Sequence, residues 1–294
     1  MLRKARLIAP LLRSLLLGAA VVSGVVVSGS ALVGCEDENA PETYVKQLKD
    51  PAKQRQAIKQ LLQMYGDAES KDKKSDDKPN VKALLEKIMG PLTESCLDDK
   101  VKDQDRSKLV KFMADTRDPR GEACLKKTLE DYKPDSNEDD VTNVLIAVAG
   151  AKMTNLQPQV MKVFQTMEFS RPKAKPLGAH IIKALKVVAD KSSEDAFLKM
   201  IEPEIPQENS PTAVNQGFWQ QTACYMLGHI QSDKAVKPLL KVLLTPAKGP
   251  LGSYALLSLV KIGKPAIGPS EALLLSLIHI STRARGARRR STLR

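Results

Sequence analysis

The stretch TACYMLGHIQSDKAVKPLLKVLL, residues 222–244, and the stretch SYALLSLVKIGKPAI, residues 253–267, decide the fold of this chain. Apolar side chains recur in both at i, i+3, i+4 and i+7. This period is typical of an amphipathic helix with one face in a core. The short polar break at residues 231–233 divides the first stretch into two helices. The sequence therefore predicts helices in pairs, one pair after another.

The same helical period continues toward the N-terminus, and no stretch alternates for long enough to predict a strand. Asp50, Asp118 and Ser210 each precede a proline, which is typical of a residue that caps the start of a helix. Comparable apolar positions recur about 40 residues apart, and a pair of helices at that period indicates a solenoid. These positions are Leu61, Met113, Val148, Leu185, Leu227 and Leu259.

At residues 222–244 and 253–267 the chain resembles the HEAT family of armadillo-like helical repeats. In that family a first helix with alanine ends near Leu-Gly, and an aspartate then opens a second helix. The opening made by Asp50, Pro51, Arg55 and Ala57 also fits the pattern.

The resemblance implies an all-α fold, an α-solenoid of about five to six HEAT-like helix pairs over residues 45–274. Second helices would line its concave surface. Residues 264–274 look like the start of a second helix that is cut short. The last repeat is therefore expected to lack a cap.

The positive charge lies at the two ends of the chain. The 294 residues carry a formal charge of +12, with no acidic residue in 1–34 or 275–294. Six arginines lie in the C-terminal segment and four basic residues in the N-terminal one, which leaves +2 for the middle. Aromatic residues make up 4% of the chain. A nucleic-acid partner is therefore not expected.

The N-terminus has the layout of an export signal, a basic start followed by an apolar run. It ends in Leu-Val-Gly-Cys at residues 32–35, which resembles the bacterial lipobox. The resemblance implies a lipoprotein signal peptide at 1–34, a lipidated Cys35 and an acidic tether at 35–44. An uncleaved transmembrane anchor is the alternative, because the apolar run can just span a bilayer.

This anchor would hold the protein in the cell envelope. Glu36 follows the lipidated position, where aspartate retains enterobacterial lipoproteins at the inner membrane. The outer membrane facing the periplasm is therefore favoured, and the inner membrane and the cell surface stay open.

The other end of the chain has a different character. Residues 275–280, LSLIHI, resemble the translated end of a transposon-type sequencing adapter. The arginine-rich remainder matches nothing in the preceding chain. Residues 275–294 are therefore expected to be a non-native basic tail. The alternative is a genuine basic tail that binds an anionic partner.

Three cysteines remain beyond Cys35. Disulfides persist in exported proteins. Cys96 and Cys124 are expected on the second helices of consecutive pairs, where a bridge is sterically allowed, so the bridged and free forms both stay open. Cys224 lies beside Ala223 in an apolar helix and is expected to be a small buried residue.

No residues form a recognisable catalytic or metal site. Neither His180 nor His229 has a His/Cys/Asp cluster beside it, so both are expected to be structural or solvated. The chain lacks Gly-x-Ser-x-Gly, a phosphate loop and His-Glu-x-x-His. We therefore expect no metal, no cofactor and no catalytic residue.

Two adjacent aromatic residues are the candidates for partner binding. Trp219 precedes Ala223 by one helical turn and is expected in the core on the same face. Phe218 then points elsewhere and is the expected exposed residue.

Together these patterns predict a membrane-tethered, exported protein-interaction scaffold or adaptor that has no catalytic activity of its own. Its partner would be an unknown protein of the cell envelope. Two alternatives stay open: a solenoid-type envelope enzyme or cofactor-handling lyase, and a structural spacer of the envelope.

Overall fold

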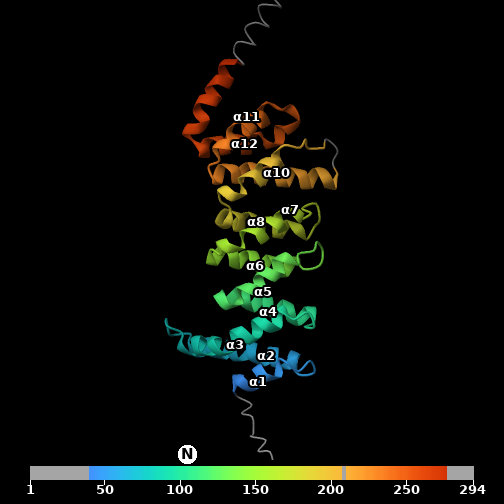
Figure 1. The fold of residues 1–294 in the computed structure, drawn as a ribbon, viewed down its shortest axis with the longest axis vertical. Helices are drawn as coiled ribbons and strands as arrows, with labels where there is room; N and C mark the ends of the chain where they lie inside the picture. The colour runs from blue at the N-terminus through green and yellow to red at the C-terminus, as the bar shows by residue number, and fades with distance from the viewer. Residues whose placement is uncertain (1–39, 207–209, 277–294) are drawn as a thin grey trace, which may run out of the picture. The chain divides into compact units, whose positions relative to one another are not determined.

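The computed structural model describes residues 40–206 and 210–276 (Figure 1). These residues form thirteen α-helices and no strand. The predicted all-α class is confirmed for this part of the chain. The predicted signal segment, Cys35 and residues 277–294 lie outside it.

The helices vary from about two turns to about five turns. In chain order they are α1 (Pro41–Gln47), α2 (Gln54–Lys71), α3 (Pro79–Leu97), α4 (Asp103–Thr116), α5 (Glu122–Glu130), α6 (Glu138–Ala151), α7 (Gln157–Thr166), α8 (Ala174–Val188), α9 (Glu194–Ile201), α10 (Pro211–His229), α11 (Val236–Leu244) and α12 (Gly252–Ile262). A last helix, residues 264–276, is called the C-terminal helix here. Gly263 separates it from α12 with a φ of +77°, a conformation that favours glycine.

Local sequence explains where several helices begin. The Ser210 hydroxyl accepts a hydrogen bond from the Ala213 backbone N–H at 3.2 Å, and Pro211 occupies the first helical position. This confirms the helix start predicted at Ser210. Asp118 likewise accepts from the Arg120 backbone N–H, but it opens the short 3-10 helix η1 (Pro119–Gly121), which leads into α5.

The main helix contacts follow the order of the chain. Among the helices α1 to α12, every substantial contact joins two helices that are one or two places apart along the chain. The even-numbered helices from α2 to α12 touch one another in succession, and α3 touches α5, which touches α7. Consecutive helices accordingly lie beside one another in Figure 1.

One continuous set of buried apolar side chains joins these helices. It extends from Leu48 before α2 to Ala266 in the C-terminal helix. The six equivalent positions identified in the sequence all lie in it, so the helical period identified the core faces correctly. These residues are Leu61, Met113, Val148, Leu185, Leu227 and Leu259.

Candidate functional site

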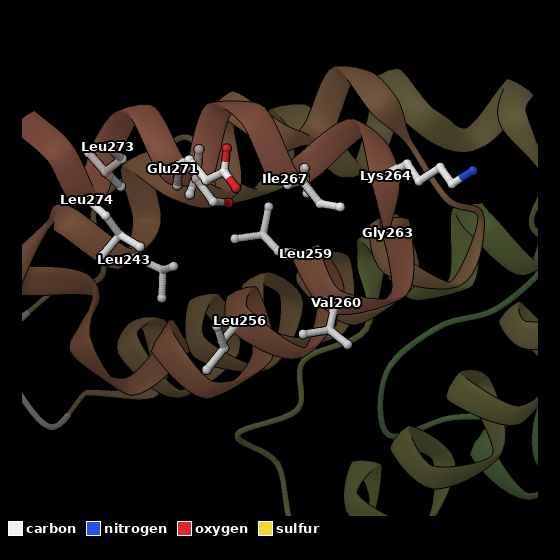
Figure 2. Close-up of a pocket in the computed structure, with 13 residues that line it drawn as sticks. Leu243, Leu256, Leu259, Val260, Gly263, Lys264, Ile267, Glu271, Leu273 and Leu274 are labelled. Atoms are coloured by element: carbon white, nitrogen blue, oxygen red, sulfur yellow. The ribbon is translucent and has the colours of Figure 1, made fainter.

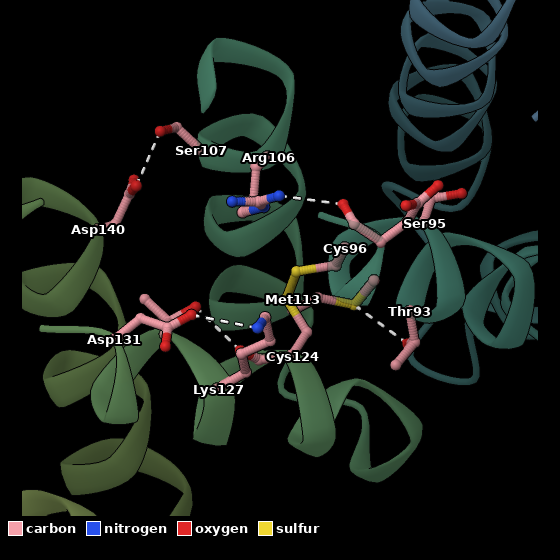
Figure 3. Close-up of a disulfide and its surroundings, with 12 residues drawn as sticks. Thr93, Ser95, Cys96, Arg106, Ser107, Met113, Cys124, Lys127, Asp131 and Asp140 are labelled. Atoms are coloured by element: carbon pink, nitrogen blue, oxygen red, sulfur yellow. Dashed lines mark hydrogen bonds and ion pairs between the residues drawn. A yellow bond between two sulfur atoms is a disulfide. The ribbon is translucent and has the colours of Figure 1, made fainter. Parts of the chain in front are cut away.

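A disulfide joins Cys96 of α3 to Cys124 of α5 (Figure 3). Their Cα atoms are 5.8 Å apart, and both residues are buried. The sequence left the bridged and free forms open, and the structure has the bridged form. Cys224, on α10, is buried and free, as expected. Burial raises the pKa of its thiol to about 12, so it is not a reactive thiolate.

A polar cleft of about 510 Å³ lies beside the disulfide, between α3, α4, α5 and the start of α6. Most of its charged side chains form ion pairs with one another. The Lys127 ammonium lies 3.3 Å from carboxylate oxygens of both Asp99 and Asp131. These contacts raise the pKa of Lys127, chiefly through the hydrogen bond to Asp131. The cleft therefore presents a paired, mixed-charge surface.

Arg106 and the hydrogen-bonded pair Ser107 and Asp140 also line this cleft. Arg106 donates to the backbone oxygens of Asp98 and Val101 at 3.0 and 3.2 Å, while its Nε is buried with no hydrogen-bond partner among the described residues. The Ser107 hydroxyl donates to the Asp140 carboxylate at 2.7 Å. Burial raises the pKa of Asp140, and the Ser107 hydrogen bond opposes that rise. Sequence patterns did not predict this cleft, because its residues come from separate helices.

Of the two aromatic candidates, Phe218 is not placed as predicted. Phe218 is only 8% exposed, and its ring stacks on that of Phe169 with centroids 4.0 Å apart. Trp219 is half-buried against the core, and its indole nitrogen has no hydrogen-bond partner in the described chain. The prediction that Phe218 is the exposed residue is wrong.

The reason lies in a segment distant in sequence. Phe169 comes from the connection between α7 and α8 and packs against Gly178, where a Cβ would lie 2.6 Å from its ring. This close approach places Phe169 over Phe218. Helical spacing within α10 alone could not reveal that partner.

The two histidines make separate contacts. Burial lowers the pKa of His180, on α8, followed by a smaller effect of Lys183. A ring nitrogen of His229 lies 2.8 Å from the Lys186 backbone oxygen, at the end of α8. Within residues 40–206 and 210–276, no group of three or more His, Cys, Asp or Glu residues is placed to hold a metal ion.

An apolar cavity of about 600 Å³ lies between α11, α12 and the C-terminal helix (Figure 2). We call it the apolar groove. Leu243 and Leu256 line it on one side, and Ile267 and Leu274 line it on the other. Leu256 is 57% exposed and Val260 69%, which is unusual for such residues.

Helix packing explains the apolar groove. The Ser258 hydroxyl of α12 donates to the Cys224 backbone oxygen of α10 at 2.7 Å, so this side of α12 is covered. Leu256 and Val260 lie on the opposite side of α12. By contrast, α6 packs between α4 and α8. The C-terminal helix follows α12 in the described chain and forms the other side of the groove.

Comparisons with protein-family models and with curated proteins find no match to this chain. The structure itself defines the class, an all-helical protein whose helices pack mainly on near neighbours in the sequence. None of the helices in residues 40–206 and 210–276 has both the length and the apolar character needed to cross a membrane.

Proposed function

We propose that this protein is an exported, membrane-tethered scaffold that binds another protein through a HEAT-like α-solenoid. The contact pattern carries the proposal, because substantial contacts join only helices one or two places apart. In solenoids each repeat likewise touches only its neighbours, and stacking creates an extended binding surface. The step from this architecture to protein binding is an analogy at the level of the fold.

The helices can be grouped as pairs of a solenoid. The pairs would be α2/α3, α4/α5, α6/α7, α8/α9, α10/α11 and α12 with the C-terminal helix. Even-numbered helices are then first helices, and odd-numbered helices are second helices. In HEAT-like repeats the second helices line the concave face, so we assign partner binding to α5, α7 and α9.

The disulfide supports an exported location. Cys96 and Cys124 lie on consecutive second helices and are joined in the structure. Such bonds persist in oxidising compartments and are rare in the cytosol. Together with the lipobox-like sequence at Cys35, this supports a lipid anchor that leaves the helices in the cell envelope, with the outer membrane facing the periplasm as the favoured site.

Site-specific photo-crosslinking in cells tests this function. A photoreactive residue would replace an exposed residue of the assigned surface: Lys126 of α5, Gln165 of α7 or Lys199 of α9. Matched controls on first helices would replace Lys111 of α4 and Ile146 of α6. One protein crosslinked from all three odd-helix positions and from neither control is the expected result.

Crosslinking of equal strength from both sets would contradict the assigned surface. Absence of any crosslinked protein at all positions would contradict the scaffold function. The enzyme and spacer alternatives would then gain weight.

A further inference from the structure

Basic side chains from three neighbouring helices gather around Tyr225 of α10. The Lys186 ammonium of α8 lies 4.9 Å from the centre of the Tyr225 ring, and the Lys261 ammonium of α12 lies 4.0 Å from it. Both distances are within the range of a cation–π contact. The imidazole of His229, one turn further along α10, is nearly parallel to the phenol ring. We call these four residues the Tyr225 cluster.

The two ammonium groups also act on the hydroxyl end of Tyr225. Hydrogen bonding from Lys186 lowers the pKa of Tyr225, burial opposes this effect, and Lys261 adds to the lowering. An ammonium group can only donate hydrogen bonds, so the tyrosine oxygen is the acceptor. The hydrogen of the Tyr225 hydroxyl thus stays available for a further acceptor, which the described residues do not supply.

The protein itself does not neutralise this positive charge. No ion pair of the described residues includes Lys186 or Lys261. Asp190, the first acidic residue after Lys186 in the sequence, accepts hydrogen bonds from Gln157 and Ser192 instead. The two ammonium groups therefore repel each other at one ring, with no carboxylate between them.

The usual role of basic residues at helix ends does not explain the cluster. Lysines near a helix C-terminus commonly interact with the last backbone carbonyls. Here a ring nitrogen of His229 lies 2.8 Å from the Lys186 backbone oxygen, and the Gln231 amide donates to the Lys261 backbone oxygen at 3.4 Å. Other side chains thus contact these carbonyls, while both ammonium groups lie at Tyr225.

We propose that the Tyr225 cluster binds a phosphate dianion, with the Lys186 and Lys261 ammonium groups and the Tyr225 hydroxyl as its donors. Two positive charges at one place match a dianion, and a tetrahedral oxyanion can accept from all three donors at once. The phosphate is either free or the monoester of a lipid headgroup. The site lies on first helices and is separate from the surface of α5, α7 and α9 assigned to the protein partner, so it goes beyond the scaffold function.

Calorimetric titration of the full chain with inorganic phosphate tests the site. The protein would be kept in an uncharged maltoside detergent at constant ionic strength and at a mildly alkaline pH, where phosphate is a dianion. Saturable binding of one ion per chain is expected. Lys186→Gln and Lys261→Gln should each weaken binding about ten-fold, because each removes a charged donor.

Two further variants separate the site from general attraction of anions to a basic surface. Tyr225→Phe keeps the ring and removes only the hydroxyl, so it should weaken binding about five-fold. Lys175→Gln removes another exposed lysine of α8, three turns from Lys186, and should bind like the original chain. Helical content and the unfolding midpoint of each variant show whether it folds.

A second probe identifies the source of the phosphate. Dihexanoyl phosphatidic acid, below its critical micelle concentration, would be titrated under the same conditions. Binding that is lost in the Lys186 and Lys261 variants supports the site with either probe. Tighter binding of the lipid indicates a headgroup, and tighter binding of inorganic phosphate indicates the free ion.

Several results would overturn the proposal. These are no saturable binding of either probe, equal weakening in Lys175→Gln and Lys186→Gln, displacement of phosphate by an equal concentration of chloride, or unchanged affinity in Tyr225→Phe. They would leave the scaffold function standing, because that function is read out by crosslinking from α5, α7 and α9.

Discussion

The region around α3 and α5 and the region around α10 and α12 join neighbouring helices in different ways. A disulfide links Cys96 to Cys124 in the first region. In the second region Gly228 of α10 fits against Ser258 of α12, and elsewhere on α10 the ring of Phe218 stacks on that of Phe169. The first region borders a polar, ion-paired cleft, and the second ends in the apolar groove. The same arrangement of helices can thus be fixed covalently or by close packing.

The largest effect is expected from the aromatic packing of the second region. Phe218→Ala should lower the free energy of unfolding by about 3–5 kcal/mol, because a buried ring is removed and a cavity remains. Trp219→Ala, at the next position, should cost clearly less because Trp219 is half-buried. Urea unfolding of the two variants measures this difference. Equal losses would mean that Phe218 is no more central to the packing than Trp219.

The covalent link of the first region should have the next largest effect. Cys96→Ala/Cys124→Ala should cost about 3–4 kcal/mol, given a loop closed over a sequence separation of 28. Reductant should produce a similar loss in the original chain and no further loss in the double variant. If reductant leaves the unfolding curve of the original chain unchanged, the disulfide does not contribute to stability.

Close packing between α10 and α12 can be tested within one helix. Gly228→Ala should destabilise by about 1–3 kcal/mol, because its Cβ would collide with the Ser258 backbone. Gly217→Ala, also in α10, meets nothing within 4 Å and should stabilise by about 0.5–1 kcal/mol. Thermal unfolding of the pair gives both values. The same sign for both changes would contradict the tight α10–α12 fit.

The smallest effect concerns pH and the polar cleft. Burial raises the pKa of Asp140 in the folded state, so the native protein binds more protons than the unfolded chain above the ordinary aspartate pKa. This group's contribution to stability therefore falls as pH rises through that window. Asp140→Asn should gain stability relative to the original chain between about pH 4 and neutrality. Unfolding free energies of both proteins, measured across this range, give the difference at each pH. If the advantage of the Asp140→Asn variant grew toward low pH instead, the assignment would be contradicted.

Sequence reasoning succeeded where a feature depends on local order. The apolar period located the helices and their buried faces, as at Leu61, Leu185 and Leu227. The Ser210-Pro211 pair marked the start of α10. Each of these signals depends on residues within a few turns of one another, and such spacing is directly visible in a sequence.

Features formed by distant segments could not be predicted. The stacking of Phe169 on Phe218 depends on the room that Gly178 leaves for the ring. The polar cleft gathers Arg106, Lys127 and Asp140 from three helices. For Cys96 and Cys124 the sequence supplied the candidates, but only the spatial arrangement supplied the short separation.

The disulfide also determines how the chain would respond to mechanical load. It bypasses residues 97–123, including the whole of α4, and connects α3 directly to α5. A force that pulled the chain from its two ends would pass through the sulfur–sulfur bond and leave α4 unloaded. The helices after α5 have no such bypass among the described residues. Under such a load the helices outside the loop would extend, while the segment closed by the disulfide kept its length.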